Sequence, residues 1–237
     1  MAVTLQAGSP VFDSKNQTVG DPTVTTLTQS FTVATGTDRM LLACVGIEDG
    51  AGSATITGVT FGGVALTEHA EVIHASWGTS GMWYLLNPSV STGDVVVTLS
   101  GADHVGVLIY CLDGVHQTTP FGTAELSSTT VSGTSSTETV GSVVSGDLVI
   151  DTMTLDSTGH SAAVGADQTQ RVNSPIGTGS DFLGSTQLGS AGGVMSWTWT
   201  GSTDFTHIAT VVRQSAGAAA PGPIFPSRRS IKALQRR

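Results

Sequence analysis

Hydrophobic and polar residues alternate in short runs along most of the chain, and this pattern predicts β-strands throughout. In residues 24–33, Leu27 and Phe31 fall on one face, while Thr26 and Ser30 fall on the other. Residues 40–47 form a continuous apolar run of strand length, which is typical of a buried central strand. Further strands are predicted at 54–61, 64–74, 81–86, 94–99, 105–112, 147–155, 168–172, 185–188, 195–200 and 207–213.

Turn-forming residues separate these runs, and no helical stretch of 10–15 residues lies between them. The pattern therefore predicts an all-β fold, an antiparallel two-sheet β-sandwich that is jelly-roll-like. Residues 97–112 and 197–212 are weakly similar, and each predicts a hairpin of strand, Ser/Thr-Gly turn and apolar strand. Two immunoglobulin-sized domains split near residue 120 are an alternative, but no linker-like break occurs there.

Composition narrows the class of protein. Ser, Thr and Gly make up 92 of 237 residues, and charged residues only 11%. A coiled coil is excluded by the scarcity of lysine, and disorder by a hydrophobic content of 39%. No apolar run approaches the ~20 residues that span a bilayer, so no membrane partner is expected. The first residues do not form a basic segment followed by an apolar one, so no secretory signal peptide is expected.

Charge divides the chain into a body, residues 1–215, and an extended Pro/Arg-rich C-terminal arm, residues 216–237. The arm has five basic residues and no acidic one; the body has four basic and eighteen acidic residues, a net charge of −14. Apolar residues interleave with the basic ones, which suits an arm that orders on an acidic protein surface. The residues expected to dock are Ile224, Phe225, Arg228, Arg229, Ile231, Lys232, Leu234, Arg236 and Arg237.

Residues that could carry catalysis form no recognisable motif. No G-x-S-x-G sequence occurs, and acids such as Asp49, Asp113, Asp151 and Asp156 fall at strand ends or on exposed strand faces. We interpret most of these acids as turn formers and solubilising charges. The sequence therefore predicts neither an enzyme nor a cofactor.

Metal sites and disulfides have equally little support. His69 and His74 are five residues apart, so a strand directs them to opposite faces. A Ca²⁺ ion at the turn of residues 48–50 is a minor alternative. Cys44 and Cys111 lie in apolar strands, which favours two buried thiols; a disulfide between them is left open.

Two tryptophans offer a second kind of site. Trp197 and Trp199 are two residues apart and share a face of a strand. Exposed, they would form a stacking platform for a glycan. Buried, they would be core residues, the interpretation that the usual place of tryptophan in thin sandwich cores favours.

A succession of motifs carries a resemblance: GVTFGGVALT at 58–67, MWYLLNP at 82–88, TGDVVVTLSG at 92–101, GVHQTTPF at 114–121, GDLVID at 146–151 and MSWTW at 195–199. Together they resemble a recurring uncharacterised β-sandwich module of phage structural proteins and bacterial surface proteins. The resemblance covers residues 24–213, implies the sandwich fold, and implies no catalytic residue. The arm lies outside it.

These observations lead to a functional hypothesis: a non-enzymatic virion structural protein, a phage capsid decoration or other virion-surface protein that docks through its arm. Its expected partners are other virion proteins, capsid or tail subunits, and further copies of itself. Nucleic acid is not expected, because a body at −14 repels phosphates. The alternatives are a carbohydrate-binding or adhesin module of a phage tail or bacterial surface, and a subunit of an extracellular filament.

Overall fold

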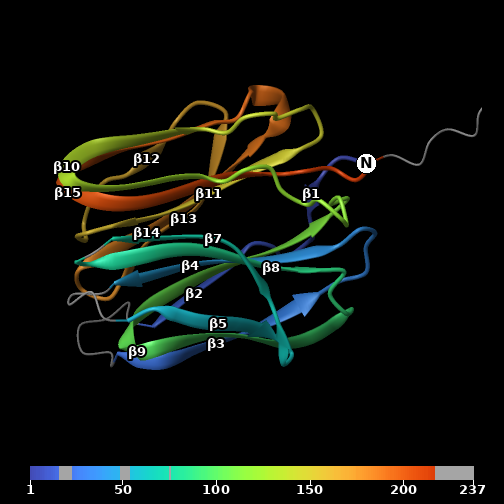
Figure 1. Ribbon diagram of the computed structural model, residues 1–237, viewed down its shortest axis with the longest axis horizontal. Coiled ribbons are helices and arrows are strands. Elements are labelled where there is room, and N and C mark those ends of the chain that lie inside the picture. Colours follow the sequence, from blue (N-terminus) through green and yellow to red (C-terminus); the bar gives the residue numbers. More distant parts are fainter. Residues whose placement is uncertain (16–22, 49–53, 75, 217–237) are drawn as a thin grey trace, which may run out of the picture.

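The computed structural model describes residues 1–15, 23–48, 54–74 and 76–216, apart from the side chains of residues 15 and 127–131. Within them the fold is all-β, with two antiparallel sheets and one turn of 3₁₀ helix, η1 (Gly189–Ala191) (Figure 1). The predicted class, two antiparallel sheets, is confirmed, while the jelly-roll connectivity stays a prediction. The predicted arm, residues 216–237, lies outside the described residues except for Ala216.

The first sheet holds nine strands, in the order β6-β5-β9-β4-β8-β7, with β1, β2 and β3 paired to β9. The bounds are β1 (Thr4–Leu5), β2 (Val11–Lys15), β3 (Val24–Val33), β4 (Met40–Glu48), β5 (Ile56–Phe61), β6 (Val64–Ala65), β7 (Thr67–His74), β8 (Gly78–Leu86) and β9 (Ser91–Asp113). As the apolar run predicts, β4 is a central strand between β8 and β9, and seven of its eight buried residues are apolar or sulfur-containing, with Gly46 the eighth.

The second sheet holds six strands, in the order β10-β15-β11-β14-β13, with β12 paired to β15. The bounds are β10 (Glu125–Thr139), β11 (Leu148–Leu155), β12 (Ala163–Val164), β13 (Gln168–Ile176), β14 (Ser180–Leu188) and β15 (Val194–Val212). Every residue of β11 is buried, because β14 and β15 flank it and further strands cover both of its faces.

The two predicted hairpins are wrong: each is one long bent strand, β9 or β15. The first part of β9 pairs with β3 and β5, and its second part pairs with β4 and β2. β10 follows both parts of β15: its end pairs with Val194–Thr198 and its start with Phe205–Ala209. The second part of β15, Phe205–Val212, also pairs with β11. Gly101 and Gly201 therefore mark bends between two layers, and the chain does not turn back there.

These bends produce a stack of four layers (Figure 1). From bottom to top in that view lie β3 and β5, then β4 and β8, then β11 and β14, and finally the end of β10 and the start of β15 with β12. Each interval has its own buried apolar cluster. The cluster of the lower interval contains Val45 and Trp83, and that of the middle interval contains Leu42 and Phe182. The upper interval contains two smaller clusters, around Met153 and Val149.

The middle interval joins the two sheets, and its contacts are partly polar. Ser80 on β8 exchanges hydrogen bonds with Thr154 on β11 (2.9 Å) and Thr206 on β15 (2.8 Å). Beside them, Gly46 on β4 and Gly106 on β9 are directly paired. A Cβ at position 46 would collide with the ring of Phe182, and one at 106 with Ile176. These glycines therefore allow the two sheets to approach closely.

The hydrophobic pattern does not predict β1, β2, β10 or β12. The longest of them, β10, has the sequence ELSSTTVSGTSSTET, with hardly an apolar residue. It is an edge strand, paired with β15 alone, and backbone pairing with β15 defines it. A strand held in this way needs no alternation of apolar side chains.

Candidate functional site

The docking residues predicted from the sequence, Ile224 to Arg237, lie outside the described residues. The structure does describe the point from which that segment leaves the body. The amide of Ser215 donates to Gly114 O, and the terminal amine of Met1 donates to Ser215 O at 2.9 Å. The N-terminus and the end of β15 are therefore held together at one end of the sandwich (Figure 1).

Asp147 fixes this end of the sandwich from within. Its side chain is buried and accepts from the amides of Val144 (3.1 Å) and Gln214 (2.9 Å), and its carbonyl accepts from Gly189 N (2.8 Å). The turn before β11, the end of β14 and the end of β15 are thereby joined at one residue. Around them the large apolar side chains Met1, Val144 and Leu188 are more than half exposed.

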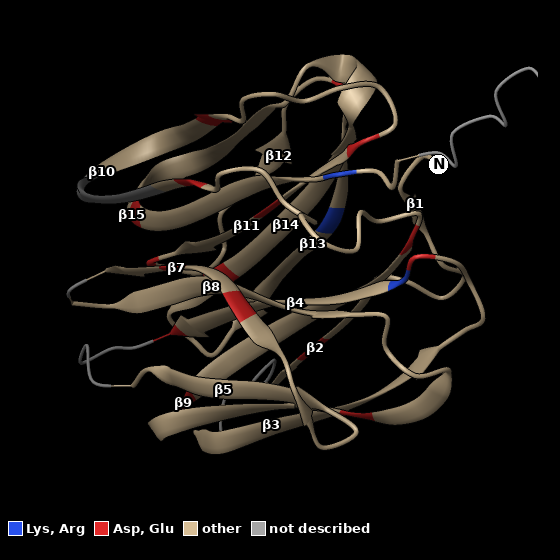
Figure 2. Cartoon of the chain, turned by 45° about the vertical axis from the view of Figure 1, so that its right-hand side comes forward, with Lys and Arg blue, Asp and Glu red and all other residues tan. Residues whose placement is uncertain are grey.

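The body has few charged residues, and most of them are acidic. Figure 2 shows red segments spread over both sheets and few blue ones. The ion pairs among the described residues all join a histidine to a carboxylate, such as His104 Nδ1 and Glu48 Oε2 at 3.0 Å. The described body therefore presents carboxylates with few cations to neutralise them.

Trp197 and Trp199 do not form a glycan platform. Their side chains are 0% and 5% exposed and pack with Met153, Leu183 and Phe205. The indole nitrogen of Trp197 donates to Asp151 Oδ2 (2.8 Å), and that of Trp199 to Gly133 O (2.9 Å). The platform interpretation is wrong because neither ring has a free face; the core interpretation is correct.

Asp151 was expected among solubilising charges, and this is also wrong. It faces the upper interval of the stack between two apolar clusters and is completely buried. Its Oδ1 accepts from the amide (2.6 Å) and hydroxyl (2.8 Å) of Ser185, and its Oδ2 from Trp197. Sequence alone does not place an acid in a core, because its partners come from β14 and β15.

This carboxylate belongs to a serine–histidine–aspartate array. Ser136 Oγ lies 2.9 Å from His207 Nδ1, and His207 Nε2 lies 3.4 Å from Asp151 Oδ2. Nucleophilic catalysis requires such a serine to reach a substrate. Here the three residues are 6%, 0% and 0% exposed, so the array acts as a buried polar network.

The remaining histidines and the cysteines form no site. The prediction that His69 and His74 lie on opposite faces of their strand is wrong. His69 lies 2.9 Å from Thr210 Oγ1 and His74 3.9 Å from Asp204 Oδ2, both on β15, because a register shift between Glu68 and Ala70 brings His69 to the face that His74 occupies. His69 also stacks on Phe121, and His74 lies beside Trp77. No group of three metal-ligating side chains occurs among the described residues, and the turn predicted as a Ca²⁺ alternative is described only at Glu48. Cys44 and Cys111 are buried free thiols, which confirms the prediction for them.

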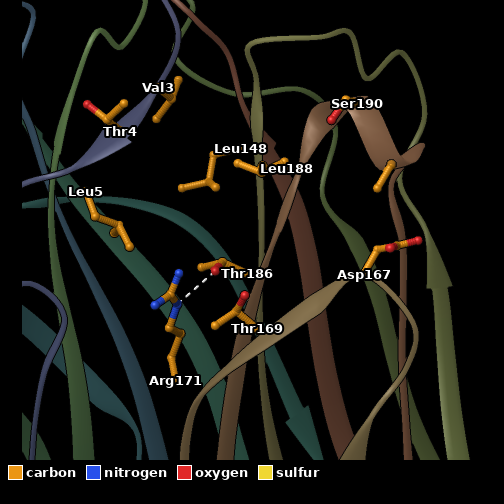
Figure 3. Close-up of a pocket in the computed structure, with 11 residues that line it drawn as sticks. Val3, Thr4, Leu5, Leu148, Asp167, Thr169, Arg171, Thr186, Leu188 and Ser190 are labelled. Carbon is orange, nitrogen blue, oxygen red and sulfur yellow. Dashed lines mark hydrogen bonds between the residues drawn. The ribbon is translucent and has the colours of Figure 1, made fainter.

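A cavity that the sequence analysis missed opens between the two sheets (Figure 3). Its volume is about 470 Å³, and it lies between β1 of the first sheet and the β13–β14 edge of the second. Arg171 on β13 provides its only cationic lining group, and the Nε of that residue donates to Thr186 Oγ1 (2.8 Å). The other lining residues are Val3, Thr4, Leu5, Leu148, Asp167, Thr169, Leu188, Ser190 and Ala191.

One signal in the sequence points to this place. Arg171 is the only lysine or arginine between residues 40 and 212, in a chain whose strands otherwise carry no positive charge over that span. An isolated arginine on a strand indicates a special position, but the apolar residues opposite it come from distant parts of the sequence: Leu148 on β11, and Val3 and Leu5 more than 160 positions earlier.

Comparison with protein-family models, with curated proteins and with solved structures finds no match to this chain. Its resemblance to the phage and bacterial sandwich module therefore stays a prediction. No helix among the described residues is long and apolar enough to cross a membrane.

Proposed function

We propose that this chain is a non-enzymatic structural protein that acts through protein–protein assembly, as a phage capsid decoration or other virion-surface protein. The body is the displayed part, and residues 216–237 are the docking segment. Its partners are other virion proteins and further copies of the chain. The site of action is the virion, with a cell surface or extracellular filament as the alternative location.

The observation that carries the proposal is the fixed exit of the docking segment. Met1, Gly114 and Asp147 hold residues 214–215 at one end of the sandwich. A segment whose first residue is held in place reaches a smaller volume than one attached through a flexible linker. It therefore loses less conformational entropy on docking.

Opposite charges support the same proposal. The docking segment carries five basic residues, and the body carries −14. Arginine binds carboxylates in a bidentate manner, so the segment of one copy is suited to the acidic body of another or to an acidic capsid surface. Such contacts weaken as salt screens them.

The buried polar residues support a structural role over catalysis. The side chains that resemble a triad have their hydrogen bonds satisfied inside the upper interval of the stack. A carbohydrate-binding function has lost its specific support, because it depended on exposed faces of Trp197 and Trp199.

Deletion of residues 216–237 tests the proposal. The truncated chain is expected to keep the thermal unfolding and circular dichroism of the full chain but to lose incorporation into its native assembly. A full-length R228E/R229E variant, which keeps the segment and reverses two charges, is expected to incorporate less as salt is lowered, opposite to the wild type. The proposal is abandoned if the truncated chain incorporates normally.

Electron microscopy of the purified native assembly separates the alternatives. Icosahedral particles bearing this chain support a capsid protein, and tails support a tail protein. Filaments made of this chain alone would move the proposal from a virion to an extracellular fibre.

A further inference from the structure

The cavity at Arg171 is shaped as a binding site, and the assembly proposal assigns it no role. Val3, Leu148 and Thr186 are buried at its floor, Leu5 and Arg171 are partly buried, and Leu188 stands 65% exposed at its rim. Small-molecule sites are commonly concave, mostly apolar, a few hundred Å³ in volume, and equipped with few polar groups. This cavity, at about 470 Å³, has that size, and Val3, Leu5, Leu148, Leu188 and Ala191 give it an apolar part, while its other lining residues are polar or charged.

A break in strand register directs Arg171. Gln170 pairs with Ser185 and Val172 pairs with Gly184, so Arg171 is the extra residue of a β-bulge on the edge strand β13. Bulges re-aim the side chain of the inserted residue. Here the side chain runs along the sheet towards Leu5 and Leu148 (Figure 3).

The hydrogen bond from Arg171 to Thr186 uses Nε and leaves the two terminal nitrogens of the guanidinium available to a ligand. Thr186 Oγ1 accepts from Nε, while the terminal nitrogens point to the apolar end of the cavity (Figure 3). Among the described residues, no carboxylate forms an ion pair with Arg171, since the ion pairs there all involve histidine. A partly buried guanidinium is stabilised when an anion replaces the water it has lost.

We propose that this cavity binds a small organic carboxylate with an apolar body. The carboxylate pairs with the terminal nitrogens of Arg171, and the apolar body lies against Val3, Leu5 and Leu148. A planar carboxylate matches the two parallel N–H donors of arginine. A polyanion such as phosphate suits the site less well, because one cation faces it, Asp167 lines the same cavity, and the whole body carries −14.

Calorimetric titration of the full chain with octanoate tests this site. Octanoate is expected to bind at one site per chain, and octanamide, which has the same body without the charge, about tenfold more weakly or not at all. Inorganic phosphate is expected to give no measurable binding. Octanamide binding as tightly as octanoate, phosphate binding in its place, or no octanoate binding at all would each overturn the proposal.

Two variants locate the binding. R171M keeps the length of the side chain and removes its charge, and should weaken octanoate binding by about tenfold or more. R213M makes the same change in charge at a residue that does not line this cavity, so it should bind as the wild type does. Equal loss in both would show a general effect of net charge and refute the site.

A variant at the rim of the cavity provides a second test in case R171M does not fold. Leu188 is exposed, so L188E should fold normally, and its carboxylate should repel octanoate from the same cavity. Octanoate binding unchanged in L188E would contradict the assignment. Arg171 is not among the residues that hold residues 214–215, so R171M should assemble as the wild type does, and failure of this inference leaves the assembly proposal standing.

Discussion

Trp197 and Asp151 are joined by a hydrogen bond of 2.8 Å from the indole nitrogen to Oδ2, inside the upper interval of the stack. The two residues come from β15 and β11, and both are completely buried. Asp151 also accepts from Ser185 and lies beside His207. One side chain thus connects three strands, and its partners replace the hydrogen bonds to water that a buried carboxyl group loses.

Removal of that carboxylate should destabilise the fold strongly. D151A is expected to lower the free energy of unfolding by about 3–5 kcal/mol, because several donors would lose their acceptor in the core. Urea unfolding measures the loss. D94N, at an exposed strand position, is the control and should change stability by less than about 0.5 kcal/mol.

A double-mutant cycle isolates the bond itself. W197F removes the donor and D151A the acceptor, and the coupling between them is expected to be about 1 kcal/mol. Additive losses would show that the two residues contribute independently.

The paired glycines between the sheets should not tolerate a methyl group. G46A would place a Cβ against Phe182 and Thr154, and G106A would place one against Ile176 and Phe12. Overpacking of this kind costs about 1–3 kcal/mol, so both variants should unfold at lower urea concentration. G58A is the matched control, since a Cβ at Gly58 on β5 meets no atom within 4 Å. Equal stability of all three variants would contradict the close approach of the sheets.

His69 should make stability depend on pH. Burial lowers the pKa of His69 from 6.5 to about 4, so between these values the unfolded chain binds a proton that the folded chain does not. The stabilisation is complete above pH 6.5 and is lost as the pH falls towards 4. H69Q keeps a polar group near Thr210 Oγ1, which lies 2.9 Å from the ring.

Thermal melts of the wild type and H69Q measure this effect. Relative to H69Q, the wild type should lose stability between pH 6.5 and 4.5, while the difference between the two proteins should stay constant from pH 7 to 8. Parallel curves across the acid range would refute the burial of His69 against Phe121.

The two thiols should be unreactive in the native protein. Burial raises the pKa of Cys111 to about 12, with a contribution from Asp113, and burial also raises the pKa of Cys44. The thiolate is the reactive form, so iodoacetamide at pH 8 should modify neither residue. The same reagent in denaturant should modify both. Rapid native labelling of either cysteine would show that its strand opens.

Local pattern was enough to predict the class of fold. Apolar runs such as 40–47 must be buried on both faces, and threonine, valine and glycine in this abundance favour strands and turns. The same reasoning predicted the buried thiols, since cysteines within apolar strands pack as small hydrophobic residues. It failed at Gly101 and Gly201, where the local signal of a turn and that of a bend are the same.

Pattern and composition are enough to establish the all-β class, the buried central strand and the opposite charges of the body and the last residues. The folded chain alone shows that Trp197 lies in the core, that Asp151 is buried beside it, and that Arg171 faces the apolar side chains of Val3, Leu5 and Leu148. The difference follows from distance along the chain. A strand's burial follows from its own side chains, whereas the partner of a carboxylate or guanidinium is contributed by strands that only folding brings near.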